Sequence, residues 1–193
     1  MRKLVVIDFL SLDGVMQAPG QPEEDTEGGF KHGGWAVPYH DEGLAESVAD
    51  SMDATDAYLF GRKTYENFAA YWPTAPREIP FTDHLNNTAK YVVSKTLRNP
   101  GWNNTKVIEG DAVQEIHTLK ELPGKRIAVL GSGELVQTLM KNDLVDEYFL
   151  TVYPILLGSG KKLFRDNDQL TKLELVDSST TSTGGVMLTY RPT

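Results

Sequence analysis

Small, polar and cationic residues follow four apolar segments of the sequence, and their types suit the binding of an anion. Gly61-Arg62-Lys63-Thr64 follows one of these segments, and Gly131-Ser132-Gly133 follows another. Glycine lets a ligand approach the backbone closely, and the first turn of a helix offers unpaired N–H groups with a partial positive charge. Because both stretches open predicted helices, we expect two anion-binding turns that could face one pyrophosphate group.

Each stretch also has a plainer interpretation when it is taken alone. Gly131-Ser132-Gly133 fits an ordinary strand-to-helix turn, and it is not a Rossmann fingerprint, because the third glycine of that pattern would fall at Val136. Arg62 and Lys63 could lie in solvent on a helix, although the helix dipole disfavours cations in a first turn. An anionic ligand would explain their placement. Lys95, which follows a third apolar segment, also fits a plain surface position.

Apolar periodicity predicts the elements that would position these turns. Short, branched apolar runs predict strands near residues 3–10, 56–60, 90–94, 126–130 and 145–153, with helices near 41–51, 62–70, 112–120 and 134–141 between them. This β-α-β-α-β-α-β-α-β order is typical of a mainly parallel sheet with flanking helices. Two short runs near 173–176 and 186–190 favour antiparallel pairing. We therefore expect an α/β fold with a mixed sheet, in a single domain over residues 1–193.

The segment over residues 11–39 is expected to be irregular. It contains six glycines and three prolines, and it directly follows the first predicted strand. A loop of this length inside a compact domain is usually either functional or disordered. We expect part of the substrate site here.

Composition excludes several classes of protein. The chain has 193 residues with a formal net charge of −8, so we expect no nucleic-acid partner and no membrane partner held by charge. It has no cysteine, which excludes disulfides, thiolate catalysis and cysteine-ligated metal sites. The four histidines are far apart in sequence, so no metal site is expected. The apolar run near the N-terminus is too short for a signal peptide, which predicts a cytoplasmic location.

Several motifs, taken together and in this order, resemble those of the dihydrofolate reductase-like superfamily. They are Ser11-Leu12-Asp13-Gly14, Gly61-Arg62-Lys63-Thr64-Tyr65-Glu66, Val129-Leu130-Gly131-Ser132-Gly133, Leu144-Val145-Asp146-Glu147 and Pro154-Ile155-Leu156-Leu157-Gly158-Ser159-Gly160. The resemblance spans residues 4–164. It is strongest for the reductase domain of the riboflavin-pathway deaminase/reductase and its small standalone bacterial relatives. A dihydrofolate reductase-like fold is therefore expected.

The resemblance implies an NADPH-dependent reductase that delivers hydride to a small molecule of the pyrimidine or pteridine type. In the riboflavin pathway, this is the 5-amino-6-(5-phosphoribosylamino)uracil reductase reaction. The resemblance also assigns the cofactor contacts. The residues matching the pyrophosphate and 2′-phosphate segment are Gly61, Arg62, Lys63 and Thr64, those on the adenosine side are Ser94 and Lys95, and those of the diphosphate and nicotinamide-ribose turn are Leu130, Gly131, Ser132, Gly133 and Glu134.

Two further residues match the substrate side of the family's site. Asp13 matches the acidic position of the substrate loop, and we expect either Asp13 or an ordered water to deliver the proton. The alternative for Asp13 is a structural anchor of its loop. Trp35 resembles a substrate-side element of the standalone relatives, and its alternative is a simple packing aromatic.

Some features depart from the superfamily's patterns. The single acid of true dihydrofolate reductases cannot be identified among Asp41, Glu42 and Glu46. Ser132 replaces the second residue of their Gly-Gly pair, so the geometry of that peptide bond stays open. The deaminase half of the riboflavin enzyme is missing, since its zinc centre uses cysteines. The alternatives are a true dihydrofolate reductase and a non-catalytic nucleotide-binding or scaffold homologue.

A homodimer is also expected from the C-terminal half. Its apolar and aromatic residues exceed what one buried strand face needs, and close relatives in the family are commonly dimeric. These residues are Tyr148, Leu150, Val152, Tyr153, Ile155, Leu156 and Leu157. The competing explanation is that helices of the same chain cover them.

Overall fold

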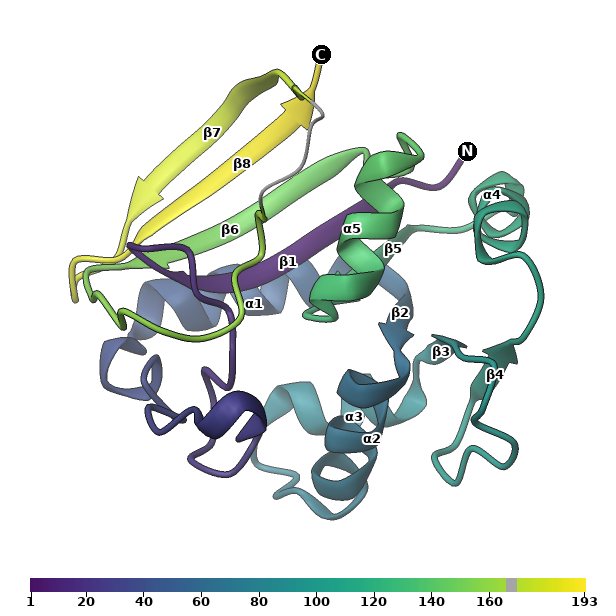
Figure 1. The fold of residues 1–193 in the computed structure, drawn as a ribbon, viewed down its shortest axis with the longest axis horizontal. Helices are drawn as coiled ribbons and strands as arrows, with labels where there is room; N and C mark the ends of the chain where they lie inside the picture. The colour runs from purple at the N-terminus through teal and green to yellow at the C-terminus, as the bar shows by residue number, and fades with distance from the viewer. Residues whose placement is uncertain (166–169) are drawn as a thin grey trace.

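A mixed β-sheet runs through the centre of the protein (Figure 1). The computed structural model describes residues 1–165 and 170–193, and within them the sheet has eight strands in the order β4-β3-β2-β5-β1-β6-β8-β7. The strands are β1 (Leu4–Ser11), β2 (Thr55–Gly61), β3 (Ala89–Val93), β4 (Thr105–Ile108), β5 (Arg126–Leu130), β6 (Glu147–Tyr153), β7 (Leu173–Thr180) and β8 (Val186–Pro192).

The sheet changes from parallel to antiparallel at β6. The first six strands pair in parallel, whereas β8 pairs antiparallel with both β6 and β7. The central strands are short runs of apolar side chains buried on both faces, as a parallel sheet covered by helices requires. The predicted mixed sheet with antiparallel C-terminal strands is confirmed.

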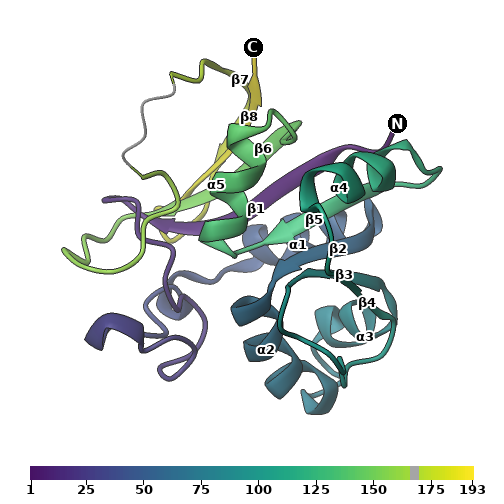
Figure 2. The same ribbon diagram turned by 45° about the vertical axis from the view of Figure 1, so that its right-hand side comes forward.

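Helices cover both faces of the sheet. Figure 1 shows α5 in front of the sheet and α1 behind it, and Figure 2 shows α4 beside α5. Side chains of α4 and α5 pack with one face of the sheet, whereas those of α1, α2 and α3 pack with the other. The helices are α1 (Glu42–Asp53), α2 (Arg62–Tyr71), α3 (Pro80–Asn87), α4 (Ala112–Glu121) and α5 (Gly133–Lys141).

One predicted stretch of the element order was wrong. The chain forms α3 and β4, which the predicted strand–helix alternation lacks. The helix α3 begins at Pro80 and buries only Thr82 and Leu85, so its eight residues carry little apolar periodicity. The strand β4 has four residues and pairs only with β3 at the sheet edge. Both elements form because neighbouring structure covers them, which local sequence does not record.

The segment between β1 and α1 is irregular, as predicted, but its apolar side chains are ordered against the core. It holds two short 3₁₀ turns, at Glu27–Gly29 and Val37–Tyr39. Val15, Phe30 and Trp35 are buried in one cluster with side chains of α1 and β6. Val15 forms a β-bridge with Lys162, so the segment passes beside the chain that follows β6. This places the loop over the carboxyl ends of the parallel strands.

Candidate functional site

The two predicted anion-binding turns lie against each other. The strands β2 and β5 are parallel neighbours, so the turns that follow them emerge at the same edge of the sheet. The backbone N–H of Gly61 donates a hydrogen bond to Ser132 Oγ at 2.8 Å. Gly61 is the N-cap of α2 and Ser132 is the N-cap of α5. The two helix N-termini are therefore joined directly.

The turn before α5 has an unusual backbone conformation. Gly131 has φ 57° and Ser132 has φ 66°, so two successive residues are left-handed. A β-carbon on Gly131 would lie 3.6 Å from Thr64 Cγ2, which shows how closely the two turns approach. The peptide bond between Gly131 and Ser132 is trans. Left-handed backbone at a non-glycine residue costs energy and clusters at ligand-binding sites.

The first turns of α2 and α5 keep donors available for a ligand. Neither helix has a side-chain N-cap hydrogen bond, because the N-cap of α2 is a glycine and Ser132 Oγ accepts from Gly61 rather than from α5. By contrast, α1 and α4 are capped by Asp41 and Asp111. Uncapped N–H groups with the positive end of a helix dipole bind anions. Two such termini side by side suit a diphosphate.

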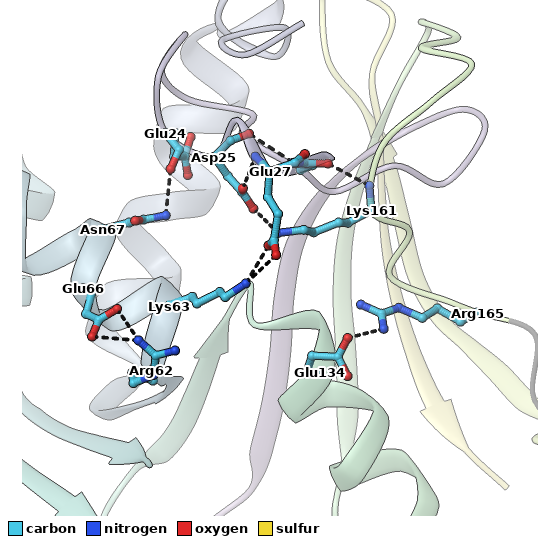
Figure 3. A network of polar contacts seen from close by, with 11 residues as sticks. Glu24, Asp25, Glu27, Arg62, Lys63, Glu66, Asn67, Glu134, Lys161 and Arg165 are labelled. Carbon is cyan, nitrogen blue, oxygen red and sulfur yellow. Dashed lines mark hydrogen bonds and ion pairs between the residues drawn. The ribbon is translucent and has the colours of Figure 1, made fainter. Parts of the chain in front are cut away.

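The cations of α2 face carboxylates of the chain (Figure 3). Arg62 Nη1 donates to both oxygens of Glu66, at 3.1 and 2.9 Å, within the same helix. Lys63 Nζ donates to both oxygens of Glu27, at 2.7 and 2.6 Å. The two cations thus have separate partners, and the structure does not bring them to one point.

A cavity of about 590 Å³ lies next to the first turn of α5, and charged side chains line it. Lys161 Nζ donates to Asp25 Oδ2 at 2.5 Å and to Glu27 Oε2 at 2.6 Å, and Arg165 pairs with Glu134 in the first turn of α5. Two lysines from distant parts of the chain therefore share the Glu27 carboxylate. These hydrogen bonds hold the pKa of Glu27 down to about 2, with Lys161 contributing most and Lys63 next.

The predicted adenosine-side residues follow β3 at the same sheet edge. Ser94 is buried, and its Oγ accepts hydrogen bonds from the backbone N–H groups of Thr96 at 3.1 Å and Leu97 at 3.0 Å. Its hydroxyl therefore stabilises the local turn. Lys95 is exposed. Neither residue joins the ion-pair network around Glu27.

The carboxylate of Asp13 anchors the loop that follows β1. Asp13 Oδ1 accepts from Ser11 Oγ at 2.7 Å and from the Leu157 N–H at 3.1 Å, and Oδ2 accepts from the Gly158 N–H at 2.8 Å. The hydroxyl of Ser11 and the two N–H groups lower the pKa of Asp13 to about 2. A carboxylate this acidic holds no proton at neutral pH, so the geometry favours the anchor over the proton donor.

Trp35 is a packing aromatic. Its side chain is buried, with an edge-to-face contact to Tyr153 at a centroid distance of 6.0 Å. Its indole Nε1 donates to the Gln17 carbonyl at 2.8 Å. The ring therefore holds the irregular segment onto the core, and its contact with a substrate stays a prediction.

The sequence analysis did not identify Lys161, Glu27 or Gln17. Lys161 directly follows Gly160, the last residue of one of the motifs that carry the family resemblance. Gln17 is buried, and its side-chain amide joins the carbonyls of Asp25 and Glu27 to the N–H of Lys161. The only sequence signal is the acidic run near Glu27, which is common on protein surfaces.

The described part of the chain lacks two other kinds of feature, a metal-binding cluster and a membrane-spanning helix. Among residues 1–165 and 170–193, no three acidic or histidine side chains gather as a metal site would require. No helix in the same residues has the length and apolar character needed to cross a membrane.

Comparison with known proteins identifies the family. The family model described as the RibD C-terminal domain matches residues 2–187 of this chain. The chain belongs to the RibD C-terminal domain family. The uncharacterized protein YyaP of Bacillus subtilis (strain 168) is 33% identical to this chain over 161 residues. The match covers 81% of this chain and 82% of YyaP.

Solved structures show the fold that the family shares. A candidate riboflavin biosynthesis protein from Shewanella sp. PV-4 has a TM-score of 0.71 at 20% identity, covering 99% of each chain. Dihydrofolate reductase from Enterococcus faecalis, solved with NADP(H), has a TM-score of 0.63 at 16% identity, covering 98% of this chain and 96% of that one. The predicted dihydrofolate reductase-like fold is confirmed.

Proposed function

We propose that the protein is an NADPH-dependent oxidoreductase of the riboflavin-pathway reductase type, which transfers hydride to a pyrimidine or pteridine substrate. The observation that carries the proposal is the pair of uncapped helix N-termini joined by the Gly61–Ser132 hydrogen bond. Membership of the RibD C-terminal domain family and the likeness to an NADP(H)-bound dihydrofolate reductase support it.

The residues present fit a dinucleotide. The N–H groups of the first turns of α2 and α5 are available to the diphosphate oxygens. Because Gly131 has no side chain, the backbone beside it stays accessible. Arg62 and Lys63 lie in the first turn of α2, where a 2′-phosphate would offset the unfavourable helix dipole. When bound, the nicotinamide supplies the hydride.

The chain's own contribution is positioning. The loop after β1 is anchored by Asp13 and Trp35, and it would help to orient a substrate beside the bound nicotinamide. Since Asp13 is ionised at neutral pH, we assign proton delivery to water rather than to this carboxylate.

The test is a titration with NADPH, followed by assays of NADPH oxidation with pyrimidine and pteridine substrates. We expect saturable binding and substrate-dependent oxidation. An absence of NADPH binding by both fluorescence and calorimetry would overturn the proposal.

One observation favours a second candidate, a nucleotide-binding protein without catalysis. Both oxygens of Asp13 accept hydrogen bonds from the chain, and Trp35 is buried, so both residues predicted for the substrate side have structural roles. Binding of NADPH without turnover of any pyrimidine or pteridine would support this candidate.

A further inference from the structure

One carboxylate lies between two ammonium groups from distant parts of the chain (Figure 3). Lys63 Nζ, in the first turn of α2, donates to both oxygens of Glu27, at 2.7 and 2.6 Å. Lys161 Nζ, from the segment after β6, donates to Glu27 Oε2 at 2.6 Å. The two lysines are therefore spaced to share a single oxyanion.

This arrangement has the chemistry of a phosphate site. Lysine ammonium groups bind phosphate oxygens as point charges, at the same distances at which they bind carboxylates. The pair lies at the uncapped end of α2, and Lys161 lines the cavity of about 590 Å³ that reaches the first turn of α5. A phosphate group there would meet two lysines and the positive ends of two helices.

We propose that Lys63 and Lys161 form a phosphate subsite and that Glu27 fills it until a phosphate group of the bound dinucleotide displaces the carboxylate. The proposal rests on the proposed function, and it adds Lys161 to the cofactor-binding residues.

The strength of the contacts allows this exchange. The side chains of Lys63 and Glu27 are 61% and 52% exposed, and ion pairs at such exposure contribute little. The 2′-phosphate of NADPH is a monoester with nearly two negative charges and three acceptor oxygens, so it competes well with one carboxylate. Because the lysines hold the pKa of Glu27 near 2, the carboxylate stays charged at neutral pH, and a competing anion is needed to remove it.

Displacement would also loosen the acidic segment that carries Glu27. This segment, residues 20–30, is tied to α2 by the hydrogen bond from Asn67 Nδ2 to the Glu24 carbonyl at 2.7 Å and by the Lys63–Glu27 pair. Gln17 holds it from the other side through the carbonyls of Asp25 and Glu27. Loss of the Glu27 pairs leaves the Lys161–Asp25 ion pair and the backbone contacts, so exchange of the segment's amides with solvent should increase.

The test compares Glu27→Gln with two controls. Glu109→Gln removes the partner of Arg98 in a similarly exposed pair of 2.7 Å that does not line the cavity, and Glu134→Gln removes a charge that does line it. Binding of inorganic pyrophosphate and of NADPH is measured by calorimetry. We expect Glu27→Gln to bind both about three- to tenfold more tightly than wild type, Glu109→Gln to be unchanged, and Glu134→Gln to gain less.

The rate of amide hydrogen exchange in residues 20–30 is the second measurement, because a simple charge effect would not change it. Pyrophosphate should speed amide exchange in residues 20–30 of the wild type, whereas Glu27→Gln should exchange rapidly without ligand. Equal affinities for Glu27→Gln and Glu109→Gln, or protection of residues 20–30 by pyrophosphate, would overturn the subsite. If pyrophosphate behaves as expected and no variant binds NADPH, the subsite stands and the proposed dinucleotide function fails. If NADPH binds equally to all variants, the subsite fails and the proposed dinucleotide function stands.

Discussion

The backbone N–H of Gly61 donates to Ser132 Oγ, and this bond joins two turns that lie 71 residues apart in sequence. Because it uses the hydroxyl that would otherwise cap α5, it leaves that helix's first N–H groups open. Two strand-to-helix turns are thus brought together at one end of the parallel strands.

Ser132→Ala should weaken both folding and cofactor binding. Loss of one partly buried hydrogen bond should lower the free energy of unfolding by about 0.5–1.5 kcal/mol. The turns would lose their connection, so we expect NADPH affinity to fall several-fold. Thr138→Ala on α5 is the control, because its hydroxyl only bonds the Glu134 carbonyl of the same helix. Urea unfolding and fluorescence titration provide the measurements, and equal behaviour of the two variants would contradict the assignment.

The protein should bind NADPH more tightly than NADH. The reason is that Arg62, Lys63 and Lys95, although they have separate surroundings in the structure without ligand, are the cations proposed to bind the extra phosphate, and a charge-assisted hydrogen bond is worth about 1.5–3 kcal/mol in good geometry. Arg62→Ala and Lys95→Ala should weaken the binding of NADPH alone. Arg77→Ala serves as the control, because Arg77 precedes α3 and its side chain is 86% exposed. Equal affinities of wild type for the two cofactors would refute the preference.

Asp13→Asn should destabilise the loop after β1 and depress turnover while leaving NADPH binding near normal. An asparagine amide cannot accept on both sides, so we expect a loss of about 1–2 kcal/mol at neutral pH. The folded pKa, about 2, lies below the ordinary value of 3.8, so this stabilisation is present above pH 3.8 and is lost as the pH falls toward 2. Unfolding measured across this range should show wild type and variant converging in acid. Unchanged stability at neutral pH would exclude the anchor role.

Asp8→Asn should stabilise the protein at neutral pH. Asp8 lies on the central strand β1 with 7% exposure, and its Oδ2 has no hydrogen-bond partner among the described residues. Burial raises the pKa of Asp8 well above 3.8, so the unfolded state releases its proton first and stability falls as the pH rises past 3.8. We expect a gain of about 1–3 kcal/mol at neutral pH that disappears in acid. Asp177→Asn, at an exposed carboxylate of β7, should show no such gain in urea unfolding.

The homodimer predicted for the C-terminal half can be tested at its antiparallel strands. Tyr148, Leu150 and Tyr153 are buried within the chain, so their apolar character does not itself call for a partner. The edge strand β7, however, exposes Leu173, Leu175 and Val176. We propose that a second copy covers them. Light scattering at micromolar concentration should give twice the 21.4 kDa of one chain. Leu175→Glu should give one chain, and a monomeric wild type would contradict the dimer.

Local sequence was sufficient to predict the main strands and the two turns. Runs such as those of β2 and β5 are continuous and branched, and the glycine and serine that follow them interrupt the pattern at the helix starts. The order of the motifs also indicated the family, because this fold needs glycine at the fixed positions where a ligand approaches the backbone. Elements without a strong period, such as α3 and β4, were beyond this reasoning because their neighbours stabilise them.

Only the tertiary structure decided the partners of the polar side chains. Glu27 meets Lys63 and Lys161, which lie 36 and 134 residues further along the chain, and no local pattern encodes such a contact. The roles of Asp13 and Trp35 were likewise open in sequence, where both a site and a structural role suit the residue type. The chain path placed backbone N–H groups on Asp13 and packed Tyr153 against Trp35. Residue type limits the chemistry a side chain can perform, whereas its partners depend on long-range packing that periodicity does not carry.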